Sequence, residues 1–446
     1  MGVALFIVYA IGILASGAII CRKANSREGF SINNRNSSAW LVGFSIVVSC
    51  VGASATMGTV GLAFSVGTPA FWWLGSGALG LSVLTIFLAR KIRRSHAITL
   101  PEMVQDFFGS QARWIISLII VVAWLAILAA QFTALKQIIA VLTGSSQASA
   151  CLLGAGLIAA HTLLGGQAGI IKLDKWQGVI LLFGLLLVIS WLLGINGDAL
   201  SEVRFEIVNR EFSADRLIYF LLILGGSYVV CPMLFGRLLS ARSEQAAQKG
   251  ALGAVLALFL VSAMVVMIGL LSKGLIPAHT VPDQVLSTVL EQVFPWWLSA
   301  LVYLMLLSAL VSSADSCLIT AGVILSHDLL KRDSIISSRI CVLGLCVAGL
   351  LLTMLGKDIL GFLLMANDVY VCGVVGPVFV GIMLHRRKTC RRSIIIAAIL
   401  LGGSLGLVAS LTENAIFSYL GLGLSVGLSL LSVELIAAAK PRTPVC

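Results

Sequence analysis

Charged residues are scarce in this 446-residue chain: only 11% are Asp, Glu, Lys or Arg, whereas 59% are apolar. The mean hydropathy is +1.05. No soluble domain has this composition, and repeated apolar runs of about 18 residues or more are typical of membrane helices. The sequence also lacks any polar stretch long enough to form a soluble domain. We therefore predict that residues 1–446 form a single all-α polytopic membrane protein in the lipid bilayer.

Metal-ligand and enzyme motifs are absent as well. The ten cysteines and five histidines are scattered, without the CxxC or Cys/His spacing of a metal site or a disulfide framework. The sequence contains neither HExxH nor a nucleophile elbow. It therefore predicts no organic cofactor and no enzymatic activity.

The net charge of +11 comes from basic residues in short, separate loops, which argues against a nucleic-acid partner. Membrane proteins concentrate Lys and Arg in their cytoplasmic loops. Most of the 30 basic residues, Arg237 among them, fall in one set of alternate loops. This bias predicts an outside N-terminus and a cytoplasmic C-terminus. We expect a multi-pass protein of a bacterial inner membrane. Nothing in the sequence implies a protein partner.

The apolar spans number about 13 by their length and flanks. The first lacks the basic region and cleavage site of a signal peptide, so we expect it to be a retained helix. The approximate limits of the spans are 3–21, 39–65, 70–90, 112–142, 147–164, 173–194, 216–240, 248–275, 297–325, 338–356, 360–384, 393–412 and 415–438.

Two of these spans contain sequences that interrupt a helix. Ser45–Gly61 is dense in Gly, Ser and Thr, which weakens regular helix. Leu224–Pro232 contains the pair Gly225-Gly226, beside Tyr228, and ends in a proline, which breaks or kinks a helix. Interrupted spans in corresponding halves point to the central site of a transporter. The alternative is that both are packing kinks, since small residues let helices approach closely.

Polar residues cluster in the ninth span. Ala309, Ser312, Ser313 and Ser316 share one helical face, and a stripe of hydroxyls suits a hard monovalent cation. The alternative is that the hydroxyls bond to the preceding turn or to a neighbouring helix. Asp315 and Asp368 also lie within spans, where a carboxylate is costly and by default a functional candidate. A position near the cytoplasmic interface remains the alternative for both.

Five ordered motifs relate the chain to a known family: Trp40…Gly43…Ser45 with Met57-Gly58…Gly61; Thr99-Leu100-Pro101-Glu102; Gly165-Gly166…Asp174…Gln177; Pro232…Arg237…Ser240-Ala241; and Ser312-Ser313-Ala314-Asp315-Ser316…Asp328-Leu329. From about Ser26 to His385 the chain thus resembles the sodium/solute symporter family, and in particular its proline, pantothenate and acetate permease branches. The second motif also predicts a short capped helix through Phe108.

The resemblance implies a leucine-transporter-like core of five-plus-five inverted repeats. The segment 3–21 would precede the core, 39–194 and 216–384 would be the two repeats, and 393–438 would add two helices. The main sodium site would use the carbonyl oxygens of Val48, Val51 and Ala309 and the hydroxyls of Ser312 and Ser313. A second sodium, found in some members, would bind Asp174, Ser312 and Ser316. The resemblance places substrate near Ala53, Ser54, Thr56, Ser227 and Tyr228, with Gln131 and Asp368 as further candidates.

The chain also departs from the family pattern. Cys50 and Gly52 replace the Asp and Ser of proline permeases, Leu173 replaces the usual Thr before Asp174, and Gly236 replaces a frequent Gln. We interpret the chain as a symporter that couples sodium entry to uptake of a small organic solute by alternating access. The alternatives are a proton-coupled transporter of the same fold, with Asp174 or Asp315 titrating, and a transporter-like membrane sensor.

Overall fold

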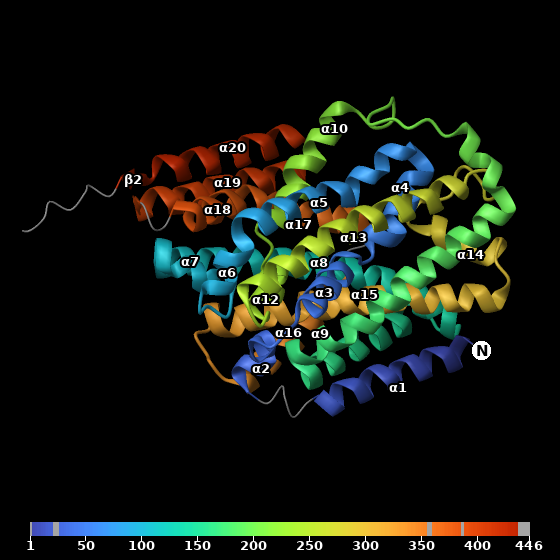
Figure 1. Ribbon diagram of the computed structural model, residues 1–446, viewed down its shortest axis with the longest axis horizontal. Helices are drawn as coiled ribbons and strands as arrows, with labels where there is room; N and C mark the ends of the chain where they lie inside the picture. Colours follow the sequence, from blue (N-terminus) through green and yellow to red (C-terminus); the bar gives the residue numbers. More distant parts are fainter. Residues whose placement is uncertain (1, 21–25, 355–358, 385–387, 436–446) are drawn as a thin grey trace, which may run out of the picture.

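The computed structural model describes residues 2–20, 26–354, 359–384 and 388–435. Most of the long helices run along the longest axis of the molecule (Figure 1). The helices are α1 (Gly2–Ile20), α2 (Arg27–Ile32), α3 (Ala39–Cys50), α4 (Thr59–Val66), α5 (Trp72–Val83), α6 (Ala89–Arg94), α7 (Leu100–Phe108), α8 (Ser110–Thr143), α9 (Gln147–Asn196), α10 (Ala214–Tyr219), α11 (Gly225–Val229), α12 (Pro232–Leu239), α13 (Glu244–Leu271), α14 (Val285–Gln292), α15 (Trp296–Ile324), α16 (Ile335–Thr353), α17 (Ile359–Tyr370), α18 (Gly376–Leu384), α19 (Arg392–Thr412) and α20 (Ala415–Leu431).

Within the described residues, 10 helices are long and apolar enough to cross a membrane, and a bent pair raises this number to 11. Helix α9 alone has 50 residues, with the non-helical Gly166 (φ 50°) inside it. That is about 75 Å of helix, more than twice the roughly 30 Å hydrocarbon core. Helix α20 has 17 residues. If α9 makes two passes and α20 makes one, the 11 spans become 13, which is the number expected from the sequence.

One short strand pair departs from the all-helical expectation. Strand β1 (Lys388–Cys390) pairs antiparallel with β2 (Val433–Leu435), with Thr389 opposite Glu434. The sequence predicted a last span that continues to residue 438. Helix α20 instead ends at Leu431, and residues 436–438 lie outside the described part of the chain.

The burial of the helices places α15 at the centre of the bundle. In its most apolar window 83% of the residues are buried, against 17% for α1. Helix α1 lies along one edge of the bundle, and α19 and α20 lie along the opposite edge (Figure 1). Large apolar side chains such as Ile86, Leu256 and Leu351 are exposed on outer helix faces. Exposed apolar faces of this kind are suited to contact with lipid.

The two interrupted spans are both broken, as the sequence predicts. Helix α3 ends at Cys50, Val51 has φ −97° and ψ 66°, and the chain turns by 66° before it continues as Ser54–Val66. The second break lies at Val230 (φ −131°, ψ 73°), directly before Pro232 begins α12. Gly225 and Gly226, where we expected that break, lie within α11. Gly225 instead allows close packing against α5, because a Cβ at Gly225 would lie 2.9 Å from the Ser76 carbonyl oxygen.

Helix α7 begins with the capping box that the sequence predicts. Thr99 Oγ1 accepts the Glu102 N–H at 3.2 Å, and Glu102 Oε2 accepts the Ile98 N–H at 2.6 Å. Partial burial would raise the pKa of Glu102, but hydrogen bonds from His327 and from the Ile98 N–H outweigh it and lower the pKa to about 2. The ionised Glu102 therefore fixes the start of α7, in the connection between α6 and α8.

Candidate functional site

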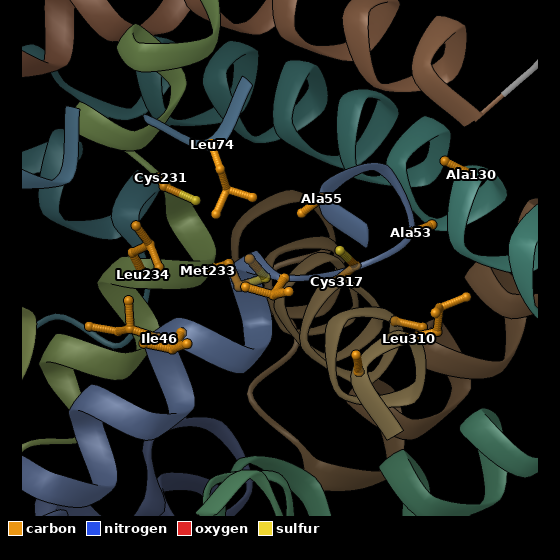
Figure 2. Close-up of a cluster of buried hydrophobic side chains, with 14 of the residues drawn as sticks. Ile46, Ala53, Ala55, Leu74, Ala130, Cys231, Met233, Leu234, Leu310 and Cys317 are labelled. Carbon is orange, nitrogen blue, oxygen red and sulfur yellow. The ribbon is translucent and has the colours of Figure 1, made fainter. Parts of the chain in front are cut away.

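A cavity of about 80 Å³ lies between the two helix breaks. In Figure 2, Ala53 and Ala55 lie on the segment after the first break, and Cys231, Met233 and Cys317 come from the second break and from α15. The cavity is lined by Ser49, Cys50, Gly52, Ser54, Ala55, Trp73, Trp124, Ile127, Gln131, Leu224, Ser227, Tyr228, Cys231, Met233, Ser313, Cys317, Leu363 and Asn367. None of these side chains is an Asp, Glu, Lys or Arg.

The first break frees backbone oxygens that meet α15. The backbone ladder of α3 ends with the Val51 N–H donated to the Val47 carbonyl. Ser313 Oγ then donates to the carbonyl oxygens of Val48 and Ser49, at 3.2 and 3.1 Å. In a membrane such freed carbonyls must face protein, a cavity or a ligand. The break therefore brings backbone oxygens of α3 and a hydroxyl of α15 to one place.

The unwound segment after Val51 is held by α8. Gln131 Oε1 accepts the Ala53 N–H at 3.0 Å. Gly52 has no room for a side chain, because a Cβ there would lie 2.7 Å from Ser313 Oγ and 2.8 Å from both polar atoms of the Gln131 amide. The glycine that replaces a family serine thus allows Gln131 and Ser313 to approach the break together.

A buried carboxylate lies beside these residues. Asp174 on α9 is fully buried, and its Oδ1 accepts the Ser312 hydroxyl at 2.5 Å. Its Oδ2 accepts the Ser45 hydroxyl and lies 3.5 Å from Arg237 Nη2. Ser312 therefore joins α15 to an ion pair between Asp174 of α9 and Arg237 of α12.

The second break is closed by α17 and bordered by an aromatic ring. The Tyr370 hydroxyl donates to the Val230 carbonyl, which satisfies a backbone oxygen that the break has freed. The Tyr228 ring packs against Gly77 of α5, where a Cβ would lie 2.8 Å from its ring carbons. The absence of a side chain at Gly77 thus allows the Tyr228 ring to lie beside the cavity.

Comparison with known proteins identifies the family. The model of the sodium:solute symporter family matches residues 30–384. The chain belongs to the sodium:solute symporter family. It is similar to the sodium/pantothenate symporter of Haemophilus influenzae, with 22% identity over 73% of this chain and 70% of the relative. For the sodium/glucose cotransporter of Vibrio parahaemolyticus the identity is 24%, over 73% of this chain and 68% of the relative.

Solved structures confirm the leucine-transporter-like fold. The chain superposes on the substrate-bound outward-open state of a Na⁺-coupled sialic acid symporter with a TM-score of 0.82 and 14% identity, over 98% of this chain and 99% of the other. The transporter MhsT, in complex with L-phenylalanine, gives a TM-score of 0.60 and 14% identity, over 89% and 98%. The protein is thus a membrane symporter that couples sodium entry to solute uptake, the first of the functions considered from the sequence.

Four of the expected solute residues come together around the cavity: Ser54, Gln131, Ser227 and Tyr228 line it. Three others do not line it. Ala53 gives its N–H to Gln131, and Thr56 Oγ1 donates to the Gly52 carbonyl at 2.8 Å. The Thr56 hydroxyl is therefore used within its own turn, which is the ordinary behaviour of Thr in a helix.

Asp368 is the third expected solute residue that does not line the cavity, and its carboxylate is already hydrogen-bonded to other side chains. Its Oδ1 accepts the Tyr219 hydroxyl at 2.8 Å and the Ser418 hydroxyl at 2.7 Å. The neighbouring Asn367, which sequence reasoning missed, lines the cavity instead. The helical turn of α17 places the two adjacent side chains in different surroundings. The presence of a carboxylate within a span therefore did not identify the residue that lines the cavity.

The structure also corrects the place of Arg237, which the charge bias assigned to a cytoplasmic loop. Arg237 is fully buried on α12, which packs against α3 and α15. Its Nη2 donates to Ser49 Oγ at 3.1 Å and to the Ser316 hydroxyl. The signal in the sequence was the spacing Pro232…Arg237: a helix that starts at Pro232 carries this arginine into the bundle.

Asp315 points away from the cavity. Its Oδ2 lies 2.5 Å from His161 Nδ1, and its Oδ1 accepts the Thr162 hydroxyl at 2.6 Å. All three side chains are buried between α9 and α15. The carboxylate that was a candidate for proton coupling is thus tied to a histidine that the sequence did not single out.

Proposed function

We propose that the coupling sodium ion binds between the first break and the serine stripe of α15. Its ligands are the carbonyl oxygens of Val48, Val51 and Ala309 and the hydroxyl oxygens of Ser312 and Ser313. The observation that supports this site is the contact of 3.2 Å between Ser313 Oγ and the Val48 carbonyl oxygen. A cation between these two oxygens replaces the hydrogen bond with an interaction to both of them.

The hydrogen bonds around the site prepare its oxygens for a cation. Ser312 gives its proton to Asp174, which leaves the lone pairs of its oxygen available to the ion. The five ligands are neutral and come from α3, from Val51 directly after it, and from α15. An ion that binds both helices stabilises the conformation in which they meet, and it shifts alternating access only by its difference in affinity between the two states.

The solute site is the cavity beside this sodium. Its polar contacts are Ser54, Gln131, Ser227, Tyr228 and Asn367, and Trp73 and Trp124 provide aromatic surface. An unpaired buried charge is costly, and among the described residues no ionised side chain lines the cavity. The geometry therefore favours a small organic solute without net charge.

The remaining features follow from the same fold. The whole chain acts as one domain, with repeats at 39–194 and 216–384, each of which contains one broken helix. The start of α1 and strand β2 lie at opposite ends of the bundle (Figure 1). Together with the bias of the basic residues, this supports an outside N-terminus and a C-terminus on the cytoplasmic face of a bacterial inner membrane. The solute crosses without chemical change and without a protein partner.

Two steps test this function. Thermal stabilisation of the purified protein across a metabolite library, with and without sodium, identifies the solute. Uptake of that solute into proteoliposomes is then measured at fixed pH with sodium or potassium outside. We expect uptake to require sodium. Uptake that is equal in potassium, and that follows an imposed proton gradient, would contradict the proposal.

A further inference from the structure

A second polar cluster lies behind the proposed sodium site, and we name it the Asp174–Arg237 cluster. Its members are Ser45, Ser49, Asp174, Arg237 and Ser316, which come from α3, α9, α12 and α15. All are at most 4% exposed. Asp174 and Arg237 supply one negative and one positive charge, so the cluster is neutral as a whole.

The arginine is held at one end of its guanidinium. Nη2 contacts Ser49, Ser316 and Asp174, whereas Nε and Nη1 have no hydrogen-bond partner within the described residues. Arginine stays charged in proteins. A positive charge therefore faces the same carboxylate and hydroxyl that would bind a second sodium.

We propose that the Arg237 guanidinium is a fixed cation in the place of a second sodium ion, so that the transporter carries one sodium in each cycle. Asp174, Ser312 and Ser316 are the residues that the family resemblance gives to that ion, and Arg237 contacts Asp174 and Ser316. The inference rests on the sodium coupling stated above and adds the number of ions.

Charge balance supports this assignment. A sodium ion added to the Asp174–Arg237 cluster would leave one positive charge uncompensated in a buried site. The next carboxylate on α15, Asp315, is already bonded to His161 and Thr162. Removal of the arginine would leave Asp174 and its hydroxyl neighbours as an anionic oxygen site, and a sodium ion bound there would balance the charge of the carboxylate.

The number of ions sets how strongly the solute is concentrated. One sodium driven by about 100 mV and a tenfold gradient sustains roughly 500-fold accumulation. Two sodium ions would sustain about the square of that ratio, roughly 250,000-fold. The guanidinium thus limits the gradient and lowers the sodium consumed for each solute molecule.

Equilibrium binding of radioactive sodium to the purified protein in lipid nanodiscs tests the inference, with potassium replacing sodium at constant ionic strength. We expect one ion per protein in the parent and two in Arg237→Met. The double variant Arg237→Met/Asp174→Asn should return to one. The control is Arg242→Met, which removes an exposed arginine just beyond the same helix and should leave the number at one.

If Arg237→Met does not fold, the number of sodium ions bound by the parent protein tests the inference by itself. Two ions in the parent, or one ion in a folded Arg237→Met, would overturn the inference. A wrong position for the main sodium site would give a different result. In that case Ser313→Ala would bind its single sodium ion with the same affinity as the parent. The count of ions and the position of the first ion are therefore tested separately.

Discussion

The hydroxyl of Ser313 on α15 donates to the carbonyl oxygen of Val48 on α3, at 3.2 Å. This contact exists because α3 loses its helical hydrogen bonds after Val47, and because Gly52 leaves space for the serine side chain. It joins a broken helix to a continuous one. A sodium ion bound there links local backbone geometry to the conformation of the whole transporter.

The cavity wall at Tyr228 can be changed without touching the solute. Gly77→Ala places a methyl group 2.8 Å from the Tyr228 ring, and the ring must move toward the cavity. We expect solute affinity to fall by about tenfold, the order of one lost contact of 1–2 kcal/mol, with sodium affinity changed less. Tyr228→Phe should act in the same direction. Competition binding with the identified solute measures this effect.

The control for Gly77→Ala is Gly156→Ala, since a Cβ at Gly156 meets nothing within 4 Å. Its solute affinity should match that of the parent. Equal affinities for the parent, Gly77→Ala and Tyr228→Phe would show that the Tyr228 ring only fills space.

Adjacent residues on α17 should have separable roles. Asn367 lines the cavity, so Asn367→Ala should lower solute affinity about tenfold or more, the order of one lost polar contact. Asp368 bonds to Tyr219 and Ser418, so Asp368→Asn should lower the unfolding temperature with a smaller effect on solute affinity. Binding isotherms and thermal unfolding of both variants distinguish these roles. A larger loss of affinity in Asp368→Asn would place the solute against the carboxylate.

The orientation in the membrane has a direct test. Short epitopes can be inserted after Ile207, between α9 and α10, and after Asp333, between η9 (the π-helical turn Leu325–Leu329) and α16. The bias of the basic residues predicts that these two connections lie on opposite sides of the membrane. We expect antibody to bind the first epitope in intact spheroplasts and the second only after permeabilisation. The reverse pattern would invert the proposed topology. An insertion that retains solute uptake is the control for correct folding.

The second helix break could be predicted closely because its cause is local. Proline lacks an N–H and crowds the preceding turn, so Pro232 marks the second break to within a few residues. The serine face of α15 followed from helical spacing alone. The first break was placed only within Ser45–Gly61, because the residue at which α3 unwinds depends on Gln131 and Ser313 in other helices.

The partners of buried charges could not be predicted in the same way. Arg237 and Asp174 meet through the packing of α12 against the core, and the charge bias of the loops placed the arginine outside it. Asp368 drew attention as a carboxylate in a span, but its partners come from α10 and α20. Long-range pairing of this kind leaves no periodic pattern in the sequence.

The most direct measurement for the main sodium site is the sodium-dependent rise in unfolding temperature of the purified protein, with potassium replacing sodium at constant ionic strength. It requires no knowledge of the solute. A hydrogen bond to a charged group is worth about 1.5–3 kcal/mol, and we expect the loss of one oxygen ligand to the sodium ion to cost a similar amount. Ser312→Ala and Ser313→Ala should therefore need roughly tenfold more sodium, or still more, for the same stabilisation. Ser299→Ala, which removes a hydroxyl from the start of the same helix, should respond as the parent does. If both Ser312→Ala and Ser313→Ala keep the parental sodium dependence, the ion binds elsewhere and the account is contradicted.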